Sequence, residues 1–315
     1  MSGETGGTPT RPLVSVVVPM YRAERFLTEA IESVLRQRYT EWEMLLVDDG
    51  GGDGCAAIAA SYARRDPNRI ALLAHPGGEN HGASVSRNLA IRHARGAYIA
   101  LLDADDVWLP EKLDAQVRLL EAHPDVGMVY GNSLYWYGWT GEPADRARDR
   151  VPILGVRHDT VLDPPTVLTR CLRGTIAVPC PCSVVLRREA VDRAGGFESR
   201  FVGVNASTED LAFFAKVMLR ERVLVANHVW DRYRRHPDSV YSRAKADGTA
   251  TAARAYYLTW LREYLTRHVV TNAELWNALS AAANPPQEAQ TRLVDRISRA
   301  ARRVIGRFRA EERRR

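Results

Sequence analysis

Residues 98–106 read YIALLDADD, an apolar run of strand length that ends in three carboxylates within four residues. Four more apolar runs flank it, as expected for strands that are buried on both faces. They are Leu13–Val18, Glu43–Val47, Ile70–Ala74 and Val126–Tyr130. Helical patterns lie between the runs, at about residues 23–37, 54–64, 83–94 and 110–122. This alternation predicts an α/β fold with a mostly parallel sheet, helices on both faces and ligands at the carboxyl ends of the strands.

The second half of the chain has a weaker pattern. Between residues 131 and 182 the periodicity gives way to Gly, Pro and aromatic residues, and short strands are predicted near 182–186 and 223–226. A helix is predicted from Thr208 to Arg220, capped by Ser207 or Thr208, because its apolar residues fall on one face. After His236 the chain is rich in Ala and helical, with a break at Asn284-Pro285-Pro286.

The composition is that of an ordinary globular protein, with 315 residues of which 45% are hydrophobic and 26% charged. No apolar run reaches the roughly 18 to 20 residues of a membrane-spanning helix, and the first residues lack the apolar segment of a signal peptide. We therefore expect neither an integral membrane protein nor an exported one. The four cysteines are too few for a disulfide framework, and Cys180-Pro181-Cys182 is spaced more closely than a zinc knuckle. Reduced thiols in a cytoplasmic protein are expected.

The net charge of +6 belongs to the end of the chain, since residues 287–315 contain ten arginines and four acidic residues. The apolar residues of this segment recur at helical spacing and arginines fill the remaining positions, which predicts a basic amphipathic helix. Such a helix either attaches to anionic lipid, peripherally at the inner face of the cell membrane, or packs its apolar stripe on the main domain or a second subunit. Nucleic-acid binding is not expected, because no recognition module accompanies the charge.

Two acidic segments follow apolar strands. Burying Asp103, Asp105 and Asp106 unpaired would be costly, and a divalent cation removes that cost because Mg²⁺ and Mn²⁺ prefer carboxylate oxygens. The alternative is a solvated acidic turn or a helix cap. The second segment, Asp48–Gly54, combines carboxylates with glycines that let the backbone approach a ligand. It has neither the spacing of a dinucleotide fingerprint nor the Lys and Ser or Thr of a P-loop.

Five blocks of sequence together resemble family 2 glycosyltransferases of the GT-A fold. They are Val14–Tyr21, Ala30–Gln37, the Asp48-Asp49-Gly50 turn, Asn80-His81-Gly82 with Ser86-Arg87-Asn88, and Asp103–Asp106. Looser matches at Gly195-Gly196-Phe197, Glu209-Asp210 and Arg234-Arg235-His236 with Ser239 extend the resemblance over residues 12–243. It implies a GT-A domain at 12–243, with a nucleotide-sugar-binding half at 12–130 and an acceptor half at 131–243. Residues 244–315 would form a helical C-terminal extension.

The resemblance also implies an activity, the transfer of a sugar from a nucleotide-diphosphate donor to an acceptor with inversion at the anomeric carbon. By resemblance, Pro19 and Tyr21 would border the nucleotide base, and Asp49 would bond the base or ribose. Arg87 would lie near the nucleotide or its phosphates. The segment Asp103-Ala104-Asp105 would complete the donor site.

The same resemblance implies a metal ion and a base. Asp105, with Asp103 or Asp106 and with His236, would hold the Mn²⁺ or Mg²⁺ that bridges the diphosphate. Asp210 would be the general base. This division of labour is chemically reasonable, because a cation stabilises the leaving diphosphate while a carboxylate deprotonates the acceptor.

Other functions and the acceptor stay open at this point. A nucleotidyltransferase would show a Gly-rich phosphate loop where this chain has Pro19-Met20-Tyr21, and a non-catalytic nucleotide-sugar-binding protein would not need the carboxylates. The acceptor is a carbohydrate, a lipid-linked glycan, a small metabolite or a peptide. Aromatic residues that would form its platform, or else pack in the core, are Tyr130, Tyr135, Trp136, Tyr137 and Trp139. Arg22, Gly51 and Cys55 depart from the family pattern near the donor, so base and sugar are also open.

Overall fold

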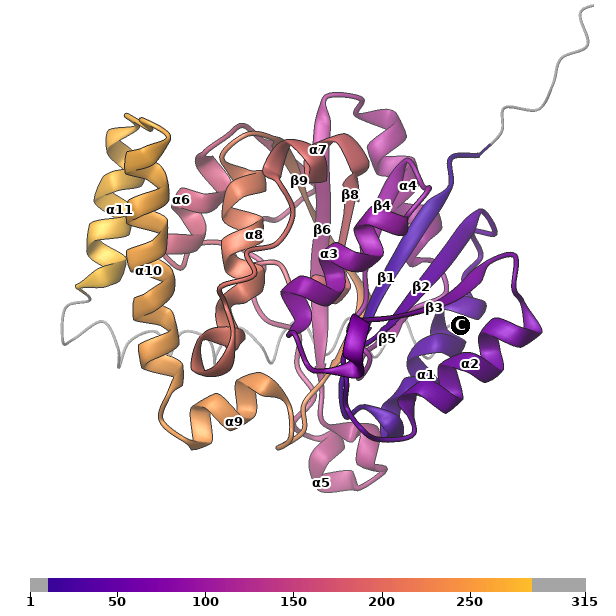
Figure 1. The fold of residues 1–315 in the computed structure, drawn as a ribbon. Helices are drawn as coiled ribbons and strands as arrows, with labels where there is room; N and C mark the ends of the chain where they lie inside the picture. Colours follow the sequence, from indigo (N-terminus) through magenta and orange to yellow (C-terminus); the bar gives the residue numbers. More distant parts are fainter. Residues whose placement is uncertain (1–10, 285–315) are drawn as a thin grey trace, which may run out of the picture.

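The computed structural model describes residues 11–284, which build one mixed sheet with helices on both faces (Figure 1). The strand order is β3-β2-β1-β4-β8-β6-β9-β5, and the short β7 pairs with β9. The strands are β1 Val14–Met20, β2 Trp42–Asp48, β3 Ile70–Ala74, β4 Tyr98–Leu101, β5 Val107–Trp108, β6 Val126–Trp136, β7 Thr160–Leu162, β8 Val184–Arg187 and β9 Arg222–Arg234. Strands β1 to β4 are parallel, β8 is antiparallel to both of its neighbours, and β9 runs parallel to β6. The predicted α/β architecture is confirmed.

The helices alternate with the strands in the first half and gather at the end of the described chain. They are α1 Glu24–Leu35, α2 Cys55–Arg65, α3 Ala83–His93, α4 Lys112–Ala122, α5 Pro143–Arg146, α6 Thr166–Leu172, α7 Arg188–Ala194, α8 Glu209–Met218, α9 Val240–Ala246, α10 Ala250–Arg267 and α11 Ala273–Ala283. Short 3₁₀ turns are η1 Pro76–Gly78, η2 Gly138–Thr140, η3 Pro181–Ser183 and η4 Gly203–Thr208. Helices α10 and α11 stand beside α8 and α6 (Figure 1).

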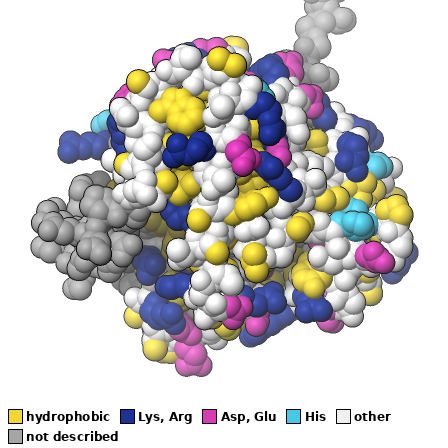
Figure 2. Space-filling model, turned by 60° about the vertical axis from the view of Figure 1, so that its left-hand side comes forward, with side chains coloured by type: hydrophobic (Ala, Val, Ile, Leu, Met, Phe, Trp, Pro, Cys, Tyr) yellow, Lys and Arg dark blue, Asp and Glu magenta, His cyan; other side chains and the backbone are white. Residues whose placement is uncertain are grey.

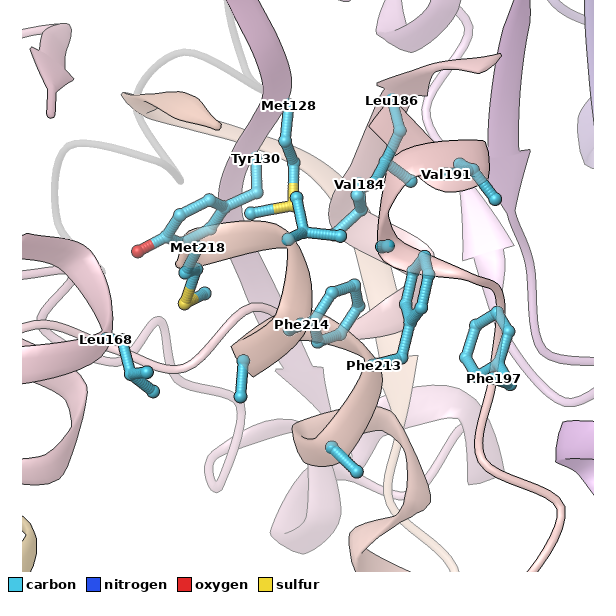
Figure 3. Close-up of a cluster of buried hydrophobic side chains, with 14 of the residues drawn as sticks. Met128, Tyr130, Leu168, Val184, Leu186, Val191, Phe197, Phe213, Phe214 and Met218 are labelled. Atoms are coloured by element: carbon cyan, nitrogen blue, oxygen red, sulfur yellow. The ribbon is translucent and has the colours of Figure 1, made fainter. Parts of the chain in front are cut away.

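The sheet has a separate hydrophobic cluster on each face, as the two-residue period of a strand requires. Val16 and Val18 of β1 join the cluster under α1, α2 and α4, whereas Val17 between them joins the cluster under α3, α8, α10 and α11. Figure 3 shows part of the second cluster, where Phe213 and Phe214 of α8 lie beside strands β6 and β8. The helices after residue 243 therefore share a core with the strands before it.

Two strands are longer than the sequence predicted. The runs expected at 126–130 and 223–226 extend to Trp136 and Arg234, because β6 and β9 pair with each other across three irregular registers. The helix predicted from Thr208 to Arg220 is α8, and Thr208 occupies its N-cap position without a capping side-chain bond. No described helix combines the length and apolar character that crossing a membrane requires. The basic helix predicted at 287–315 lies outside the described residues.

The surface of the described part carries both signs of charge. Figure 2 shows Lys and Arg side chains interspersed with Asp and Glu over one face, among neutral and apolar groups. This agrees with the sequence, because the charges before residue 287 balance.

Candidate active site

Three parallel strands end at the same edge of the sheet. Met20 of β1 is in register with Asp48 of β2, and Val17 of β1 is in register with Leu101 of β4. Pro19 is half-buried near the end of β1, and Tyr21 directly after the strand is exposed. Both residues that were predicted to border a base thus lie at the carboxyl edge, where open α/β sheets bind ligands.

Asp49 follows β2, and its carboxylate is turned into the protein, since only 2% of the residue is exposed. It accepts hydrogen bonds from the backbone N–H groups of His81 and Gly82, at 2.8 and 3.0 Å, and from the side-chain amide of Asn80 at 3.0 Å. Gly50 allows this close packing of two loops, because a Cβ atom there would lie 2.5 Å from the carbonyl oxygen of Gly78. Both carboxylate oxygens of Asp49 are thus bound within the protein, where they position a loop, and its bond to the base or ribose stays a prediction.

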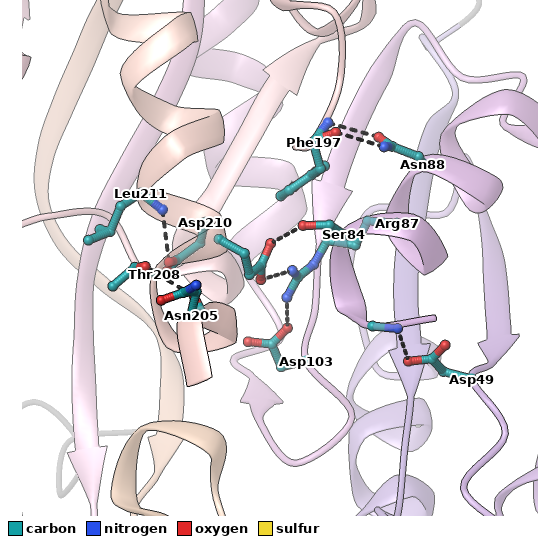
Figure 4. A network of polar contacts seen from close by, with 12 residues as sticks. Asp49, Ser84, Arg87, Asn88, Asp103, Phe197, Asn205, Thr208, Asp210 and Leu211 are labelled. Carbon is teal, nitrogen blue, oxygen red and sulfur yellow. Dashed lines mark hydrogen bonds and ion pairs between the residues drawn. The ribbon is translucent and has the colours of Figure 1, made fainter. Parts of the chain in front are cut away.

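Arg87 of α3 joins the end of β4 to the start of α8 (Figure 4). Its guanidinium donates to Asp103 at 2.6 Å and also pairs with Glu209, which accepts a further bond from Ser84 at 3.1 Å. Burial would lower the pKa of Arg87, but the two carboxylates raise it above its usual value. Only 3% of Arg87 is exposed, so its charge is compensated inside the protein. The predicted contact with a nucleotide would need this arrangement to open.

Replacing Arg87 with Met is expected to lower the free energy of unfolding by about 3–5 kcal/mol, because two carboxylates would lose their buried partner. Urea denaturation monitored by circular dichroism measures the change. Arg118→Met is the matched control, since Arg118 pairs with Asp114 but leaves 73% of its side chain exposed. That pair is expected to contribute less than about 1 kcal/mol. Equal effects of the two substitutions would contradict the buried bridge.

Asp105 and His236 come together from the turn after β4 and the segment after β9. The Nε2 atom of His236 lies 2.9 Å from a carboxylate oxygen of Asp105, and 26% of the Asp105 side chain is exposed. Arg234 fastens the two segments, because its side chain donates to the carbonyl oxygen of Asp105 at 2.7 Å and to Glu29 at 2.5 Å. The Nδ1 atom of His236 is buried without a hydrogen-bond partner among the described residues. An imidazole and a partly exposed carboxylate fit the ligand types expected for a divalent cation.

The other two residues of the motif face the interior. Ala104 is buried in the core, so only its backbone is available to a donor. Asp106 is fully buried and accepts a hydrogen bond from the backbone N–H of Arg234 at 2.8 Å. A ligand oxygen of Asp106 and the thiol sulfurs of Cys180 and Cys182 lie within 4.8 Å of one another. Among residues 11–284 no other three potential metal ligands lie that close together, so Asp106 is grouped with thiols instead of with Asp105 and His236.

Asp210 stands at the start of α8, next to Glu209 (Figure 4). Glu209 is occupied by Arg87 and Ser84, whereas the Asp210 carboxylate accepts a hydrogen bond from the backbone N–H of Leu211 at 2.8 Å. Burial, followed by the negative charge of Glu209, raises the pKa of Asp210 to about 7, against the opposing effect of Arg87. A carboxylate with this pKa is suited to accept a proton near neutral pH.

The aromatic residues predicted to form an acceptor platform lie in different places, some in the core and some along a cavity. Tyr130 is fully buried and donates its hydroxyl to the carbonyl oxygen of Ala177, so it is not part of an acceptor platform. Tyr135 and Trp136 are half-buried on β6. Tyr137 and Trp139 line a cavity of about 590 Å³ that His236 also borders. Its cationic residues are Arg148, Arg235 and Lys245.

The family model that matches this sequence and two of its curated relatives are described as glycosyltransferases. The family model described as glycosyl transferase family 2 matches residues 15–195. The putative glycosyltransferase EpsE of Bacillus subtilis is 38% identical over 46% of this chain and 51% of its own length. The UDP-Glc:alpha-D-GlcNAc-diphosphoundecaprenol beta-1,3-glucosyltransferase WfgD of Escherichia coli is 36% identical over 38% of this chain and 45% of its own length. The chain thus spans about half the length of these curated relatives.

Comparison with solved structures extends over most of the chain. S. aureus TarS 1-349 in complex with UDP has a TM-score of 0.55 and 18% identity, over 89% of this chain and 78% of that one. The mannosyltransferase PcManGT from Pyrobaculum calidifontis, in complex with GDP-Man and Mn²⁺, has a TM-score of 0.54 and 21% identity, over 93% of this chain and 81% of that one. At this level of identity the likeness establishes the fold.

Proposed function

Because the chain belongs to glycosyl transferase family 2 and has the GT-A fold, we propose that it transfers a sugar from a nucleoside-diphosphate donor to an acceptor, with inversion at the anomeric carbon. The observation that carries this proposal is the Arg87 bridge. It connects the acidic motif at the end of β4 with the Glu209-Asp210 segment at the start of α8. Asp103, a candidate metal ligand, and Glu209, the neighbour of the candidate base Asp210, are thereby held on either side of one buried guanidinium.

In this mechanism Asp105 and His236 would hold Mn²⁺ or Mg²⁺, whose positive charge would stabilise the departing diphosphate. The acceptor oxygen forms a bond to the anomeric carbon while the bond from that carbon to the diphosphate oxygen breaks. Asp210 takes the proton that the acceptor hydroxyl loses. Arg87 keeps Asp103 and Glu209 compensated, so that these neighbouring carboxylates add less repulsion as the diphosphate leaves.

We further propose that the cavity beside His236 receives the acceptor. Tyr137 and Trp139 line it with aromatic rings of the kind that stack on sugars, and Arg235 and Lys245 offer positive charge, whereas Arg148 pairs with Asp145, which also lines the cavity. Such a lining suits an acceptor that carries sugar rings next to phosphates. A glycan on a lipid diphosphate has both, and the name of the relative WfgD gives this acceptor class. A carbohydrate or peptide without phosphate would make less use of Arg235 and Lys245.

The activity is tested with a panel of UDP- and GDP-sugars in the presence of Mn²⁺, by measuring the nucleoside diphosphate released with and without a lipid-diphosphate-linked sugar. We expect release that depends on one donor and rises with the acceptor. Formation of a nucleoside triphosphate and a sugar 1-phosphate, when inorganic pyrophosphate is added to the nucleotide sugar, would instead favour a nucleotidyltransferase. Binding of a nucleotide sugar without turnover, under any acceptor condition, would favour a non-catalytic binding protein.

We also propose that residues 287–315 attach the protein to the inner face of the cell membrane, which would place it beside a lipid-linked acceptor. At about 1 kcal/mol per arginine near an anionic surface, half of the ten arginines would give strong, salt-sensitive binding. Deleting residues 287–315 is expected to abolish co-sedimentation with phosphatidylserine vesicles at low salt. Phosphatidylcholine vesicles are the control. Failure of the intact protein to co-sediment would favour a packing role for this segment.

A further inference from the structure

We propose that Cys180, Cys182 and Asp106 form a second metal site, for a borderline-soft cation such as Zn²⁺. It differs in ligand chemistry from the hard-cation site proposed at Asp105 and His236. The inference does not depend on the proposed transferase activity, because it rests on a buried group of side chains behind the acidic motif.

Three potential metal ligands from two segments of the chain converge at one place. The Cys180-Pro181-Cys182 segment enters the turn η3, which brings the two sulfur atoms within 2.9 Å of each other. Asp106 reaches the same place from the segment between β4 and β5, so that the three ligand atoms lie within 4.8 Å of one another. Two thiolates and a carboxylate make three protein ligands of the types found at zinc sites, with a fourth position left for water or another side chain.

The carboxylate of Asp106 is not fully satisfied by hydrogen bonds. Asp106 is fully buried, one of its oxygens accepts from Arg234, and the other has no hydrogen-bond partner in the described structure. Leaving a buried acceptor unpaired costs about 1–3 kcal/mol, and more for a charged group, so such atoms call for an explanation. A cation bound between Asp106 and the thiols would supply the missing partner. Asp231, also fully buried, contacts the Cys182 thiol at 3.1 Å and has an unpartnered oxygen of its own.

Side chains outside the group hold the backbone of the turn in place. The indole N–H of Trp108 donates to the carbonyl oxygen of Cys182 at 2.9 Å, and the Gln116 amide donates to that of Ser183 at 2.7 Å. These bonds orient the ligand-bearing backbone, as outer partners do around metal sites. Tetrahedral Zn–S bonds of about 2.3 Å would hold the sulfurs about 3.8 Å apart, so the thiols would separate by about 1 Å. Cys180 is only half-buried, which gives this movement room and gives the cation a route from solvent.

Soft ligands also determine which metal binds. Thiolates select Zn²⁺ over Mg²⁺ and Mn²⁺, which prefer oxygen. The two proposed sites should therefore load independently, although Asp105 and Asp106 are adjacent in sequence. Zinc at the thiol site would hold the segment from which Asp105 projects.

The test is the zinc content of the full chain, prepared without a histidine tag, reduced, incubated with Zn²⁺ and freed of loosely bound metal on a desalting column. Mass spectrometry of the metal is expected to find about one zinc per chain in the wild type. The matched control Cys171→Ser changes a thiol outside the group and should keep the metal, and so should Asp105→Asn. Cys180→Ser and Cys182→Ser should each weaken zinc binding at least tenfold. Less than about 0.1 zinc per wild-type chain would overturn the proposal.

Cobalt gives a readout that does not depend on the folding of any variant. The wild type incubated with Co²⁺ is expected to show the near-ultraviolet charge-transfer absorption of cobalt–thiolate bonds, which added Zn²⁺ removes and excess Mn²⁺ does not. Absence of the band would overturn the proposal. So would undiminished reaction of the Cys180 and Cys182 thiols with a thiol reagent in the presence of Zn²⁺, or zinc retained by both serine variants.

Discussion

Asp105→Asn is expected to reduce sugar transfer by about 10³-fold or more while leaving the fold intact. Loss of the carboxylate would remove a ligand of the proposed cation, whose stabilisation of the leaving diphosphate contributes several kcal/mol to the transition state. Metal-dependent nucleotide binding should weaken with it. The fold should survive, because Asn keeps the shape of the side chain and its hydrogen bond to His236. Initial rates, together with nucleotide titration in the presence and absence of Mn²⁺, measure both effects.

A nearby exposed acid provides the control for Asp105. Asp238 lies two residues after His236 and is exposed, so Asp238→Asn should leave rate and metal dependence within about twofold of the wild type. The metal dependence itself is checked by dialysis against EDTA followed by return of Mn²⁺. Full activity of the metal-free protein would exclude the proposed role of Asp105, whatever the substitution does.

The sheet was largely predictable, because its strands are apolar on both faces and therefore stand out in sequence. The extensions of β6 and β9 were not, since their second halves carry polar residues such as Asn132 and Asp231 in a strand with irregular register. The second halves of β6 and β9 are stabilised by pairing with each other, although they lie about 100 residues apart in sequence. A local sequence pattern does not reveal such pairing. Strand length in this half is set by tertiary pairing, which overrides local propensity.

The candidate site, like the sheet, was predictable from the sequence only in part. Sequence placed the acidic residues at strand ends, but it did not show that Asp49 turns inward or that Asp106 meets two thiols. The partners of Asp49 lie more than 30 residues away, and Glu209 lies 122 residues from Arg87. An available signal was that Arg87 precedes an acidic strand end and an acidic pair within residues 1–286, whose charges balance. One buried arginine can compensate two carboxylates that lie together at the carboxyl edge of the sheet.

Asp210→Asn should lower turnover by about 10²–10⁴-fold, the usual effect of losing a general base, with little change in donor affinity. The substitution keeps the shape and the hydrogen bond to Leu211 but removes the basicity. Asp114→Asn is the matched control, because Asp114 is also an acid in the first turn of a helix, α4. It should leave turnover unchanged. Single-turnover rates with saturating donor separate the chemical step from binding.

The pH dependence of Asp210 distinguishes a base from a helix-dipole partner. With a pKa of about 7, the carboxylate is half protonated at neutral pH, so wild-type turnover should rise from pH 6 to pH 8 as the basic form fills.

The free energy of unfolding should change with pH in the opposite direction to turnover. The folded-state pKa of Asp210 lies above the ordinary value of 3.8, so the protonated acid stabilises the folded protein. This stabilisation is complete below about pH 4 and is lost as pH rises through 7. At pH 8, Asn should therefore match or exceed Asp in thermal stability. A dipole or capping role requires the reverse, a loss of about 0.5–2 kcal/mol with turnover unchanged. Near-wild-type turnover of Asp210→Asn would remove Asp210 as the base, and Glu209 could replace it only by giving up its ion pair with Arg87.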